Sequence, residues 1–310
     1  MKCIVTGGAG FIGSNLVERL LKDKHEVVVV DDFSLGKKEN LNFAKDNKNL
    51  IIYEKGICDY DIEDCIGGVD VVFHVAALPR VQYSIQHPLE TNKVNIEGTL
   101  NLLRICKEEN IKRFIFSSSS SVYGDQDTLP LIESMKPNPM SPYALQKSVS
   151  EYYCKLFYEE YGLETIMLRY FNVFGPRQDP KGDYACLIPK FIDLISKGIR
   201  PTINGDGKQT RDFTYISDVV DANIKAMNTT YKECFGQVFN IGSGQNRSVN
   251  EVTMDILRLT NKNIEPLHGP AKKEPYNTLA SIWKAGDMLG WRPKIKFKEG
   301  LKRTYQHFRN

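Results

Sequence analysis

Two residues able to move a proton, Tyr143 and Lys147, are four positions apart in the segment Tyr-Ala-Leu-Gln-Lys. Residues four apart lie on the same face of a helix, so this spacing would place the ammonium beside the phenol. A nearby positive charge favours the phenolate and lowers a pKa that starts at about 10. The pair is therefore a candidate general base for proton transfer near neutral pH. The same pair also occurs on amphipathic helices that carry no chemistry.

A glycine-rich segment near the N-terminus, Gly7-Gly-Ala-Gly-Phe-Ile-Gly13, separates an apolar run at residues 3–5 from apolar residues at helical spacing. Glycines let the backbone approach a ligand closely, and the N-terminus of the following helix would attract a pyrophosphate. The next apolar run, residues 26–30, ends in Asp31 and Asp32, where an acid can bind a ribose hydroxyl. These features predict a dinucleotide site, against the alternative of a tight strand-to-helix turn without a ligand. The acids favour NAD over NADP, because a 2′-phosphate would meet a negative charge.

The charge of the chain is nearly balanced, with 41 Lys and Arg residues against 38 Asp and Glu residues and a net charge of +3 over 310 residues. Because no basic tract stands out, we expect no nucleic-acid partner. We also expect no signal peptide and no membrane association, since the N-terminus leads straight into a core strand and no apolar run could span a bilayer. The seven cysteines are scattered without metal-ligand spacing, which indicates no metal site and reduced thiols in a cytoplasmic protein.

Short apolar runs alternate with helical patterns along the first half of the chain. The predicted strands are residues 3–5, 26–30, 50–53, 69–75, 114–116 and 165–170, and the predicted helices include 91–110 and 143–161. Ser141 is a suitable N-cap for the second of these helices, and Pro142 suits its first turn. The alternation predicts an α/β fold with a doubly wound parallel (Rossmann) sheet, whose ligands lie beyond the carboxyl ends of the strands.

The composition becomes more irregular after residue 170, where turn residues are frequent. Because no repeat and no low-complexity linker separates the two parts, we expect the second region to be interleaved with the first. The predicted cofactor domain is 1–168, with later segments at about 212–240 returning to it. The predicted smaller α/β substrate domain is formed by 169–211 and 241–310.

Five ordered motifs carry a family resemblance over essentially the whole chain. They are Thr6-Gly-Gly-Ala-Gly-Phe-Ile-Gly-Ser14, Ser117-Ser-Ser-Ser-Ser-Val-Tyr-Gly124, Tyr143-Ala-Leu-Gln-Lys147, Arg169-Tyr-Phe-Asn-Val-Phe-Gly-Pro-Arg177 and Gly205-Asp-Gly-Lys-Gln-Thr-Arg-Asp-Phe213. Together they resemble the extended, nucleotide-sugar-modifying branch of the short-chain dehydrogenase/reductase superfamily. Within that branch, the chain is most similar to the UDP-glucose and UDP-N-acetylglucosamine 4-epimerases.

The resemblance implies a 4-epimerase that uses NAD and a UDP-sugar. Tyr143 would take the proton from the sugar 4-hydroxyl while C4 passes a hydride to NAD⁺, and the hydride would return to the other face of a 4-keto sugar. Ser119 would hydrogen-bond the 4-oxygen, and Lys147 would hold the nicotinamide ribose and bias Tyr143 towards phenolate. Related dehydratases and decarboxylases resemble one another in carrying an acid just before Val-Tyr-Gly, where this chain has Ser120 and Ser121. This difference favours epimerisation.

Further site residues follow from the resemblance. For the cofactor they are Gly7, Gly10, Phe11, Ile12, Gly13, Asp31, Asp32, Asp59, Ala76, Ala77, Ser117, Tyr143, Lys147 and Tyr170. For the substrate they are Ser119, Tyr143, Asn172, Leu187, Lys190, Thr202, Arg211, Lys272 and Thr278. Leu187, Lys190 and Thr202 fall where related enzymes hold the uracil and its ribose. Arg211 is the best diphosphate candidate because its fork can bind two oxygens, and the alternative for it is a structural ion pair.

Two segments depart from the family pattern. Related epimerases carry Gly-Asp-Ile after the third strand, with the Asp-Ile pair at the adenine, but Gly56-Ile-Cys-Asp59 lacks one residue. Asp59 is expected to substitute there. The family's later arginine has no clear match in residues 270–276, where the loop is shortened and Lys272 is expected to stand in.

Thr278 bears on the choice of sugar. At this position in the relatives, a bulky residue narrows the sugar pocket and a small one admits an N-acetyl group. The turn at 177–180, with Tyr184 and Ala185, also resembles the N-acetyl-preferring subgroup, so we expect UDP-GlcNAc and UDP-GalNAc as substrates with some activity on glucose. The alternative is that Thr278 only reflects the shortened loop.

The predicted helices at 91–110 and 143–161 resemble those that pair subunits in this family, so we expect a homodimer. Two other interpretations of the chain stay open. One is a related enzyme: a UDP-glucuronate or pentose 4-epimerase, or a dehydratase or decarboxylase with unusual residues. The other is a non-catalytic NAD-binding regulatory protein. The joint presence of Ser119, Tyr143 and Lys147 disfavours it, because a protein without catalytic activity would not need to keep all three residues.

Overall fold

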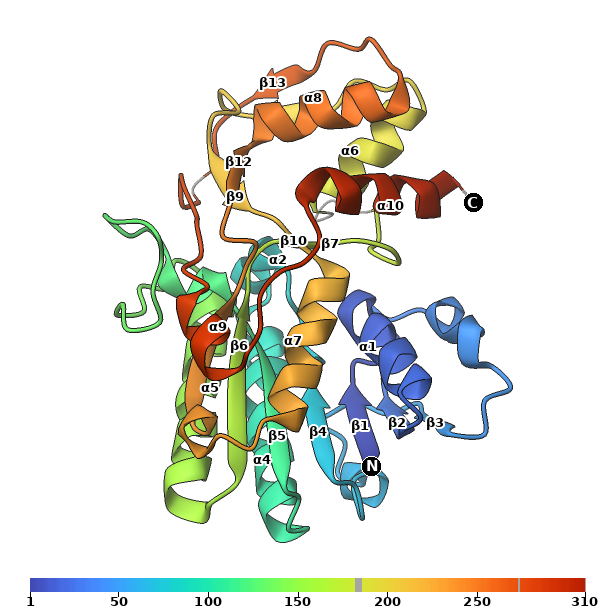
Figure 1. The fold of residues 1–310 in the computed structure, drawn as a ribbon, viewed down its shortest axis with the longest axis vertical. Helices are drawn as coiled ribbons and strands as arrows, with labels where there is room; N and C mark the ends of the chain where they lie inside the picture. The colour runs from blue at the N-terminus through green and yellow to red at the C-terminus, as the bar shows by residue number, and fades with distance from the viewer. Residues whose placement is uncertain (182–185, 273, 310) are drawn as a thin grey trace.

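The computed structural model of the chain describes residues 1–181, 186–272 and 274–309. Within those residues the main sheet has seven parallel strands in the order β11-β6-β5-β4-β1-β2-β3. Their bounds are β1 Lys2–Thr6, β2 Glu26–Val30, β3 Leu50–Tyr53, β4 Val71–His74, β5 Arg113–Ser119, β6 Glu164–Tyr170 and β11 Gln237–Ile241. The predicted doubly wound parallel sheet is confirmed (Figure 1).

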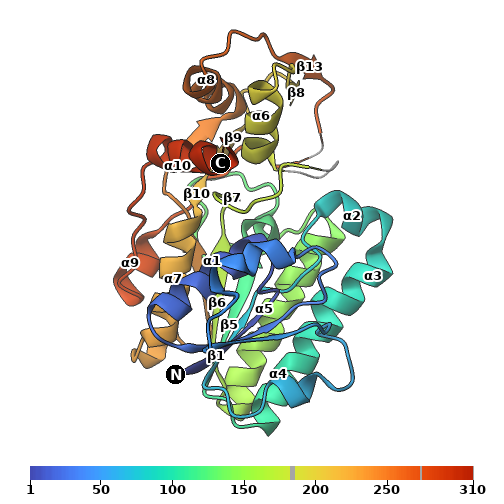
Figure 2. The same ribbon diagram turned by 90° about the vertical axis from the view of Figure 1, so that its right-hand side faces the viewer.

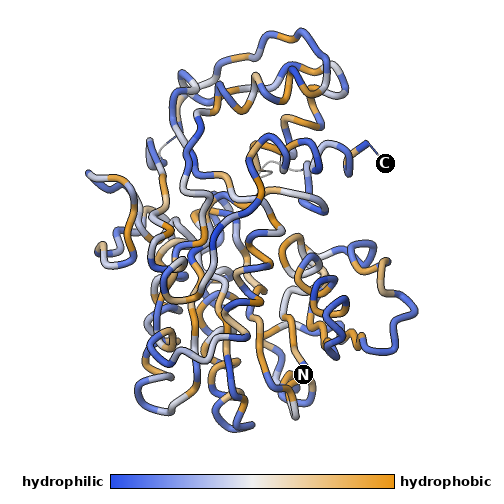
Figure 3. Tube along the Cα trace, in the orientation of Figure 1, coloured by the Kyte–Doolittle hydropathy of each residue, from blue (hydrophilic) through white to orange (hydrophobic). Residues whose placement is uncertain are grey.

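Helices cover both faces of this sheet, and the central residues of its inner strands are accordingly apolar and buried. The long helices are α1 Phe11–Lys22, α4 Thr99–Glu108, α5 Pro142–Tyr161 and α7 Ile216–Asn228. α1 and α7 pack together on one face, and α4 and α5 pack on the other (Figure 2). Because successive strand side chains point to opposite faces, Cys3 and Val5 join one apolar cluster and Ile4 joins another. Figure 3 shows the apolar residues concentrated along these strands.

The helix predicted to carry the proton-transfer pair is α5, and its ends follow the sequence signals. The Ser141 hydroxyl caps the first turn by accepting the Ala144 N–H at 3.2 Å. Pro142 occupies the first helical position, and Gly162, in the left-handed conformation at φ 72°, ends the helix. The predicted helix at 143–161 is therefore confirmed.

The predicted helix at 91–110 is built from three consecutive stretches: α3 (Pro88–Asn92), a π-helical stretch η3 (Lys93–Gly98), and α4. Asn95 lies in η3, and its side chain accepts the Leu78 N–H at 2.8 Å and donates to the Gln146 side chain at 2.8 Å. π turns inside helices often accompany functional sites. Here the buried amide fixes the backbone that follows β4.

The smaller region lies above the carboxyl ends of the parallel strands (Figure 1). Its elements are β7 Val173–Phe174, α6 Leu187–Ser196, β8 Thr202–Asn204, β9 Thr210–Asp212, β10 Thr214–Tyr215, β12 Asn246–Ser248, α8 Val249–Thr260, β13 Leu267–Gly269 and α10 Phe297–Arg309. Shorter elements elsewhere are η1 Lys38–Ala44, η2 Ile62–Cys65, α2 Val81–Gln86, η4 Ser120–Tyr123 and η5 Lys232–Cys234.

The chain returns to the main sheet through α7 and β11 before it enters the smaller region again. α9 (Trp283–Met288) also packs on β11, although it lies within the 241–310 segment expected to belong to the substrate domain. The residue bounds of the two domains stay a prediction.

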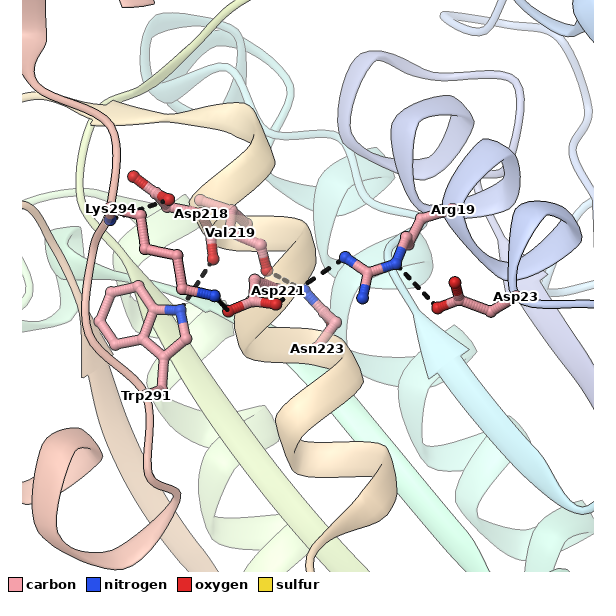
Figure 4. Close-up of polar contacts among 8 residues, drawn as sticks. All are labelled: Arg19, Asp23, Asp218, Val219, Asp221, Asn223, Trp291 and Lys294. Atoms are coloured by element: carbon pink, nitrogen blue, oxygen red, sulfur yellow. Dashed lines mark hydrogen bonds and ion pairs between the residues drawn. The ribbon is translucent and has the colours of Figure 1, made fainter.

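Polar contacts fasten the C-terminal segment to α7 and, through it, to α1 (Figure 4). The fully buried Trp291 donates its indole N–H to the Asp218 C=O at 2.9 Å. The Asp218 carboxylate accepts the Lys294 N–H at 3.1 Å, and the Lys294 ammonium pairs with Asp221 at 3.0 Å. Asp221 also lies 3.8 Å from the guanidinium of Arg19 on α1. The end of the chain is thus fixed to the larger region as well as to the smaller one.

All seven cysteines are free thiols. Within the described residues, no helix has both the length and the apolar character needed to cross a membrane.

Candidate active site

A cavity of about 780 Å³ lies between the carboxyl ends of the parallel strands and the smaller region. Most of the residues predicted for cofactor and substrate line it. They are Gly7, Gly10, Phe11, Ile12, Gly13, Asp31, Asp32, Ala76, Ala77, Ser117, Ser119, Tyr143, Lys147, Tyr170, Asn172, Arg211, Lys272 and Thr278. The fold therefore brings the glycine loop (residues 7–13), the two acids, the serine segment (residues 117–121) and the Tyr143–Lys147 pair to one space.

The glycine loop fits the pyrophosphate of a dinucleotide. A Cβ on Gly13 would lie 2.1 Å from the Gly7 carbonyl oxygen, and a Cβ on Gly7 would lie 2.8 Å from the Ala76 Cα, so neither position accepts a side chain. This close packing brings the first turn of α1, with its unpaired backbone N–H groups, to the cavity wall. The residues present therefore match the NAD that the sequence predicts.

The two acids after β2 have different surroundings. Asp31 is buried, and its carboxylate accepts the Ala9 N–H at 2.8 Å and the Phe33 N–H at 2.9 Å. Burial raises the pKa of Asp31, and these two hydrogen bonds oppose the rise only in part. Asp32 is exposed and accepts the Ser34 N–H at 2.9 Å. Asp31 therefore also anchors the glycine loop, a role that its position in the sequence does not reveal.

The Tyr143 phenol is 8 % exposed and is hydrogen-bonded to Ser119. Burial raises the pKa of Tyr143 to about 12, and the hydrogen bond from Ser119 lowers it by less than burial raises it. Ser119 is held in turn by Ser121, whose N–H and hydroxyl both donate to its oxygen, at 3.1 and 2.9 Å. The expectation of a lowered phenol pKa is therefore wrong for the protein without a ligand, because desolvation outweighs the hydrogen bond from Ser119.

The Lys147 ammonium faces the serine segment rather than the phenol. Its Nζ donates to the Ser117 C=O at 2.8 Å and lies 4.6 Å from the Phe116 ring centroid, but 6.0 Å from the Tyr143 ring centroid. Burial lowers the pKa of Lys147 to about 8, and the nearby Glu151 acts in the opposite direction. This orientation explains why the ammonium does not lower the pKa of Tyr143.

The Ser117 hydroxyl is part of a buried polar group on the α7 side of β5. Its Oγ lies 3.1 Å from the phenol oxygen of Tyr170, and the Asn223 side chain of α7 donates to that same oxygen at 2.8 Å. Burial raises the pKa of Tyr170 to about 12, so this phenol stays protonated. Asn223, which the sequence pattern does not single out, therefore positions two residues of the cavity wall.

A buried ion pair supports the other side of the serine segment. The Ser118 hydroxyl donates to Glu151, and Glu151 pairs with Arg169 of β6 through two contacts of 2.8 and 2.6 Å. Glu151 is four residues after Lys147, as Lys147 is four residues after Tyr143. This helical spacing is a signal in the sequence that could have identified Glu151 as a residue on the same face. Through this pair, α5 is held against the sheet at the level of the proposed chemistry.

Arg211 at the substrate end of the cavity already has a carboxylate partner. Its Nη2 lies 3.1 Å from Glu274, and its Nη1 donates to the Tyr276 C=O at 3.1 Å. Asn172, in a left-handed conformation at φ 26°, donates to the Asp212 C=O at 3.3 Å. The structural ion pair considered for Arg211 is therefore present, and a diphosphate would have to replace Glu274.

Asp59 does not line the cavity within the described part of the chain. Its carboxylate accepts the Gly56 N–H at 2.8 Å and so closes a tight turn. Gly56 and the buried Ile57 line the cavity in its place. An adenine contact by Asp59 stays a prediction.

The residues expected at the uracil also lie outside the described cavity wall. They are Leu187, Lys190 and Thr202. Leu187 begins α6 and packs against the main apolar core, and Thr202 is exposed on β8. Their contact with a ligand stays a prediction. Tyr184 and Ala185 fall outside the described residues.

Two buried side chains on the cavity wall carry polar atoms that lack a partner among the described residues. They are Oε1 of Gln178 and Oγ1 of Thr278, and each side chain belongs to a residue that is 7 % exposed. A buried polar atom without a partner costs about 1–3 kcal/mol, so a bound polar group would stabilise both. Gln178 lies in the 177–180 turn, but no sequence signal marks it as a wall residue.

The model of the NAD dependent epimerase/dehydratase family matches residues 3–242. One similar solved structure is a UDP-N-acetylglucosamine 4-epimerase of Methanobrevibacter ruminantium in complex with UDP-N-acetylmuramic acid. Its sequence is 41 % identical, the match covers 99 % of this chain and 97 % of that chain, and the TM-score is 0.94. A UDP-glucose 4-epimerase of Thermotoga maritima, solved with UDP-glucose, is 39 % identical over 100 % of this chain and 99 % of its own, also with a TM-score of 0.94.

Relatives with other activities are nearly as similar. A UDP-N-acetyl-alpha-D-glucosaminuronate decarboxylase of Bacillus cytotoxicus is 37 % identical over 99 % of this chain and 98 % of its own length. Overall similarity therefore does not separate epimerases from decarboxylases, and the side chains in the cavity must do so.

The raised pKa of Tyr143 predicts that its phenol stays protonated in the NAD-free protein. Ultraviolet absorbance of the phenolate, taken as the difference between the wild type and Tyr143→Phe, should show no ionisation of Tyr143 between about pH 6 and pH 10. Ser119→Ala should move the ionisation still higher, because it removes the hydrogen bond that lowers the pKa. A step near neutral pH that is missing from Tyr143→Phe would contradict this account.

Proposed function

Because the chain belongs to the NAD dependent epimerase/dehydratase family, we propose that it is a UDP-hexose 4-epimerase. It would interconvert UDP-GlcNAc with UDP-GalNAc, and UDP-glucose with UDP-galactose, through a 4-keto intermediate. The observation that carries the proposal is the Tyr143 phenol, hydrogen-bonded to Ser119 in the cavity that the glycine loop also lines. Where related dehydratases and decarboxylases resemble one another in carrying an acid, Ser120 and Ser121 line the cavity.

Each residue of the site has a distinct part in this reaction. The glycine loop, with Asp31 and Asp32, would hold NAD⁺, which would supply a hydride acceptor for sugar C4 and, once reduced, a hydride donor for the 4-keto carbon. Tyr143 takes the proton of the 4-hydroxyl and gives it back, while Ser119 hydrogen-bonds the 4-oxygen. Lys147, held by the Ser117 C=O, is placed to bind a ribose hydroxyl. Since oxidation and reduction cancel, the cofactor is expected to stay bound between turnovers.

The diphosphate would bind at Arg211, Asn172 and Lys272, which line the cavity together. Glu274 occupies the guanidinium of Arg211 without substrate, so a phosphate oxygen must exchange for a carboxylate oxygen there. This exchange keeps the buried part of Arg211 paired in both states, which avoids leaving a charge without a partner.

The sugar pocket favours an N-acetyl group. Thr278 is small enough to leave space beside the sugar, and its free hydroxyl can donate to an acetyl C=O. The free Oε1 of Gln178 can accept an amide N–H. Both atoms would gain a partner from the amide of UDP-GlcNAc or UDP-GalNAc. A sugar hydroxyl can also donate and accept, so the preference rests on the acetyl volume beside the small Thr278 side chain.

The reaction is tested by incubating the purified protein with UDP-GlcNAc, UDP-glucose and UDP-glucuronate and resolving the products by NMR. We expect C4 epimers, with UDP-GlcNAc converted most efficiently. Tyr143→Phe should lower kcat roughly 10²- to 10⁴-fold while NAD stays bound. A decarboxylated or unsaturated product would support the second candidate, which the 37 % identical decarboxylase favours. No product from any sugar would support a non-catalytic NAD-binding protein.

The substrate preference is tested at Thr278. Thr278→Tyr should lower kcat/KM for UDP-GlcNAc roughly tenfold more than for UDP-glucose, because the larger ring fills the acetyl space. Thr278→Val is the matched control, since it keeps the volume and removes only the hydroxyl, and it should cause a smaller loss. Equal losses for both sugars in Thr278→Tyr would rule out Thr278 as the gate.

A homodimer is supported by an apolar stripe on the outer face of α5. Leu145, Tyr152 and Leu156 are 52 %, 59 % and 48 % exposed and repeat at helical spacing. Light scattering should give twice the mass of one chain, and Tyr152→Glu should give a monomer, because it places a charge within the stripe. The control Tyr60→Glu, at a residue 93 % exposed outside α5, should leave the dimer intact. A wild-type monomer would exclude this interface.

The cytoplasmic location expected from the cysteine pattern stays a prediction.

A further inference from the structure

After β7 the chain forms a turn at residues 176–179 that lies against α1 (Figure 1). Within this turn, Arg177 Nη2 donates to Asn15 Oδ1 and pairs with Glu18 Oε2, both at 2.7 Å, and both partners belong to α1. The guanidinium also lies 5.1 Å from the ring centroid of Phe43 in η1. One side chain thus joins the turn to two elements from the N-terminal part of the chain.

A second ion pair connects the same turn to the segment after β2. The Lys37 ammonium lies 3.0 Å from the Asp179 carboxylate, and both side chains are partly exposed, at 49 % and 38 %, so salt should weaken the pair. The Lys37 backbone N–H donates to the Ala9 C=O of the glycine loop at 3.1 Å. A third connection comes from Asn15, whose Nδ2 donates to the Pro176 C=O at 3.2 Å.

These connections surround the expected dinucleotide site. Lys37, Arg177, Gln178 and Asp179 all line the cavity together with the glycines of the loop. α1 and the segment after β2 would provide the phosphate-binding and ribose-binding residues of the proposed site, and the turn is fixed to both of them. A molecule held by the loop and the acids therefore lies in a space that the turn helps to enclose.

The turn adopts an unfavourable local geometry in order to make these contacts. Arg177 has a left-handed backbone at φ 70°, which is uncommon for a residue other than glycine. Its Nε is buried without a partner among the described groups. Strained conformations of this kind persist only where surrounding contacts determine them, and they are concentrated at functional sites.

We propose that the 176–179 turn retains the bound dinucleotide, with Arg177 and the Lys37–Asp179 pair as positioning residues. This rests on the proposed function, in which NAD stays bound between turnovers. The turn takes no part in hydride or proton transfer. It slows the departure of the cofactor, because the contacts to α1 and to Lys37 must break before the turn can move away from the cavity.

The test is the rate at which purified protein loses its NAD during dialysis, with the nucleotide quantified after denaturation. Lys37→Gln should release NAD about threefold faster, as expected for a partly exposed ion pair. Arg177→Met should release it roughly tenfold faster or more, because it removes the contacts of this partly buried guanidinium with both Asn15 and Glu18, while Glu18 keeps only Lys22. Higher salt should accelerate release from the wild type more than from Lys37→Gln.

Two further variants show whether the pairing itself matters. The neighbouring Lys38 pairs with Glu54 at 2.6 Å, and neither lines the described cavity wall, so Lys38→Gln is the matched control and should release NAD at the wild-type rate. The double variant Lys37→Asp with Asp179→Lys should restore slow release, whereas Asp179→Lys alone should not.

Unchanged release in Lys37→Gln and Arg177→Met, or a double variant as fast as Asp179→Lys, would overturn the role of the turn while leaving the proposed function standing. If circular dichroism shows that Arg177→Met is misfolded, Lys37→Gln and the double variant decide, since both change partly exposed side chains. A wild-type protein that binds no NAD at all would overturn the proposed function and the role of the turn together.

Discussion

The backbone of Gly13 packs directly on the Gly7 carbonyl, and no side chain fits between them. This contact turns the chain from β1 into α1 within a few residues and points the N-terminus of the helix at the space beyond the sheet. Asp31 secures the same turn from β2 by accepting the Ala9 N–H. Because the strands of the main sheet are parallel, the serines at the end of β5 lie at the same edge of the sheet as the glycine loop. The parallel sheet therefore places the cofactor site next to the proton-transfer residues.

Burial has opposite effects on the two residues of the proton-transfer pair. It keeps the Tyr143 phenol protonated and makes the Lys147 ammonium easier to deprotonate, since both charged forms lose contact with water. The ammonium is nevertheless held by the Ser117 C=O, with the carboxylate of Glu151 one helical turn away. A phenol in this setting needs an added positive charge to become a base, and a bound nicotinamide cation would provide it. Chemistry at Tyr143 would then depend on the cofactor being in place.

Local sequence signals were sufficient for the parts of this structure that depend on neighbouring residues. The strands are apolar runs bounded by turns, α5 begins at its serine cap, and Tyr143 and Lys147 share a helix. The partners of the site residues could not be predicted in this way. These partners lie far apart in the chain. Lys147 donates to the Ser117 C=O, Asn223 donates to the Tyr170 phenol oxygen, and Arg211 forms an ion pair with Glu274. The π-helical stretch around Asn95 likewise accompanies a tertiary contact, because the Asn95 side chain accepts a hydrogen bond from the Leu78 backbone N–H.

The chain passes repeatedly between the main sheet and the smaller region, by way of β6, α7, β11 and α9, and Trp291 fastens its last part to α7. No single cut would yield one fragment that binds nucleotide and another that binds sugar. Recombination between homologous genes would have to exchange several separate segments at once to transfer a new specificity. A change in the sugar that is accepted is therefore acquired more readily by point substitutions on the cavity wall than by exchange of whole domains.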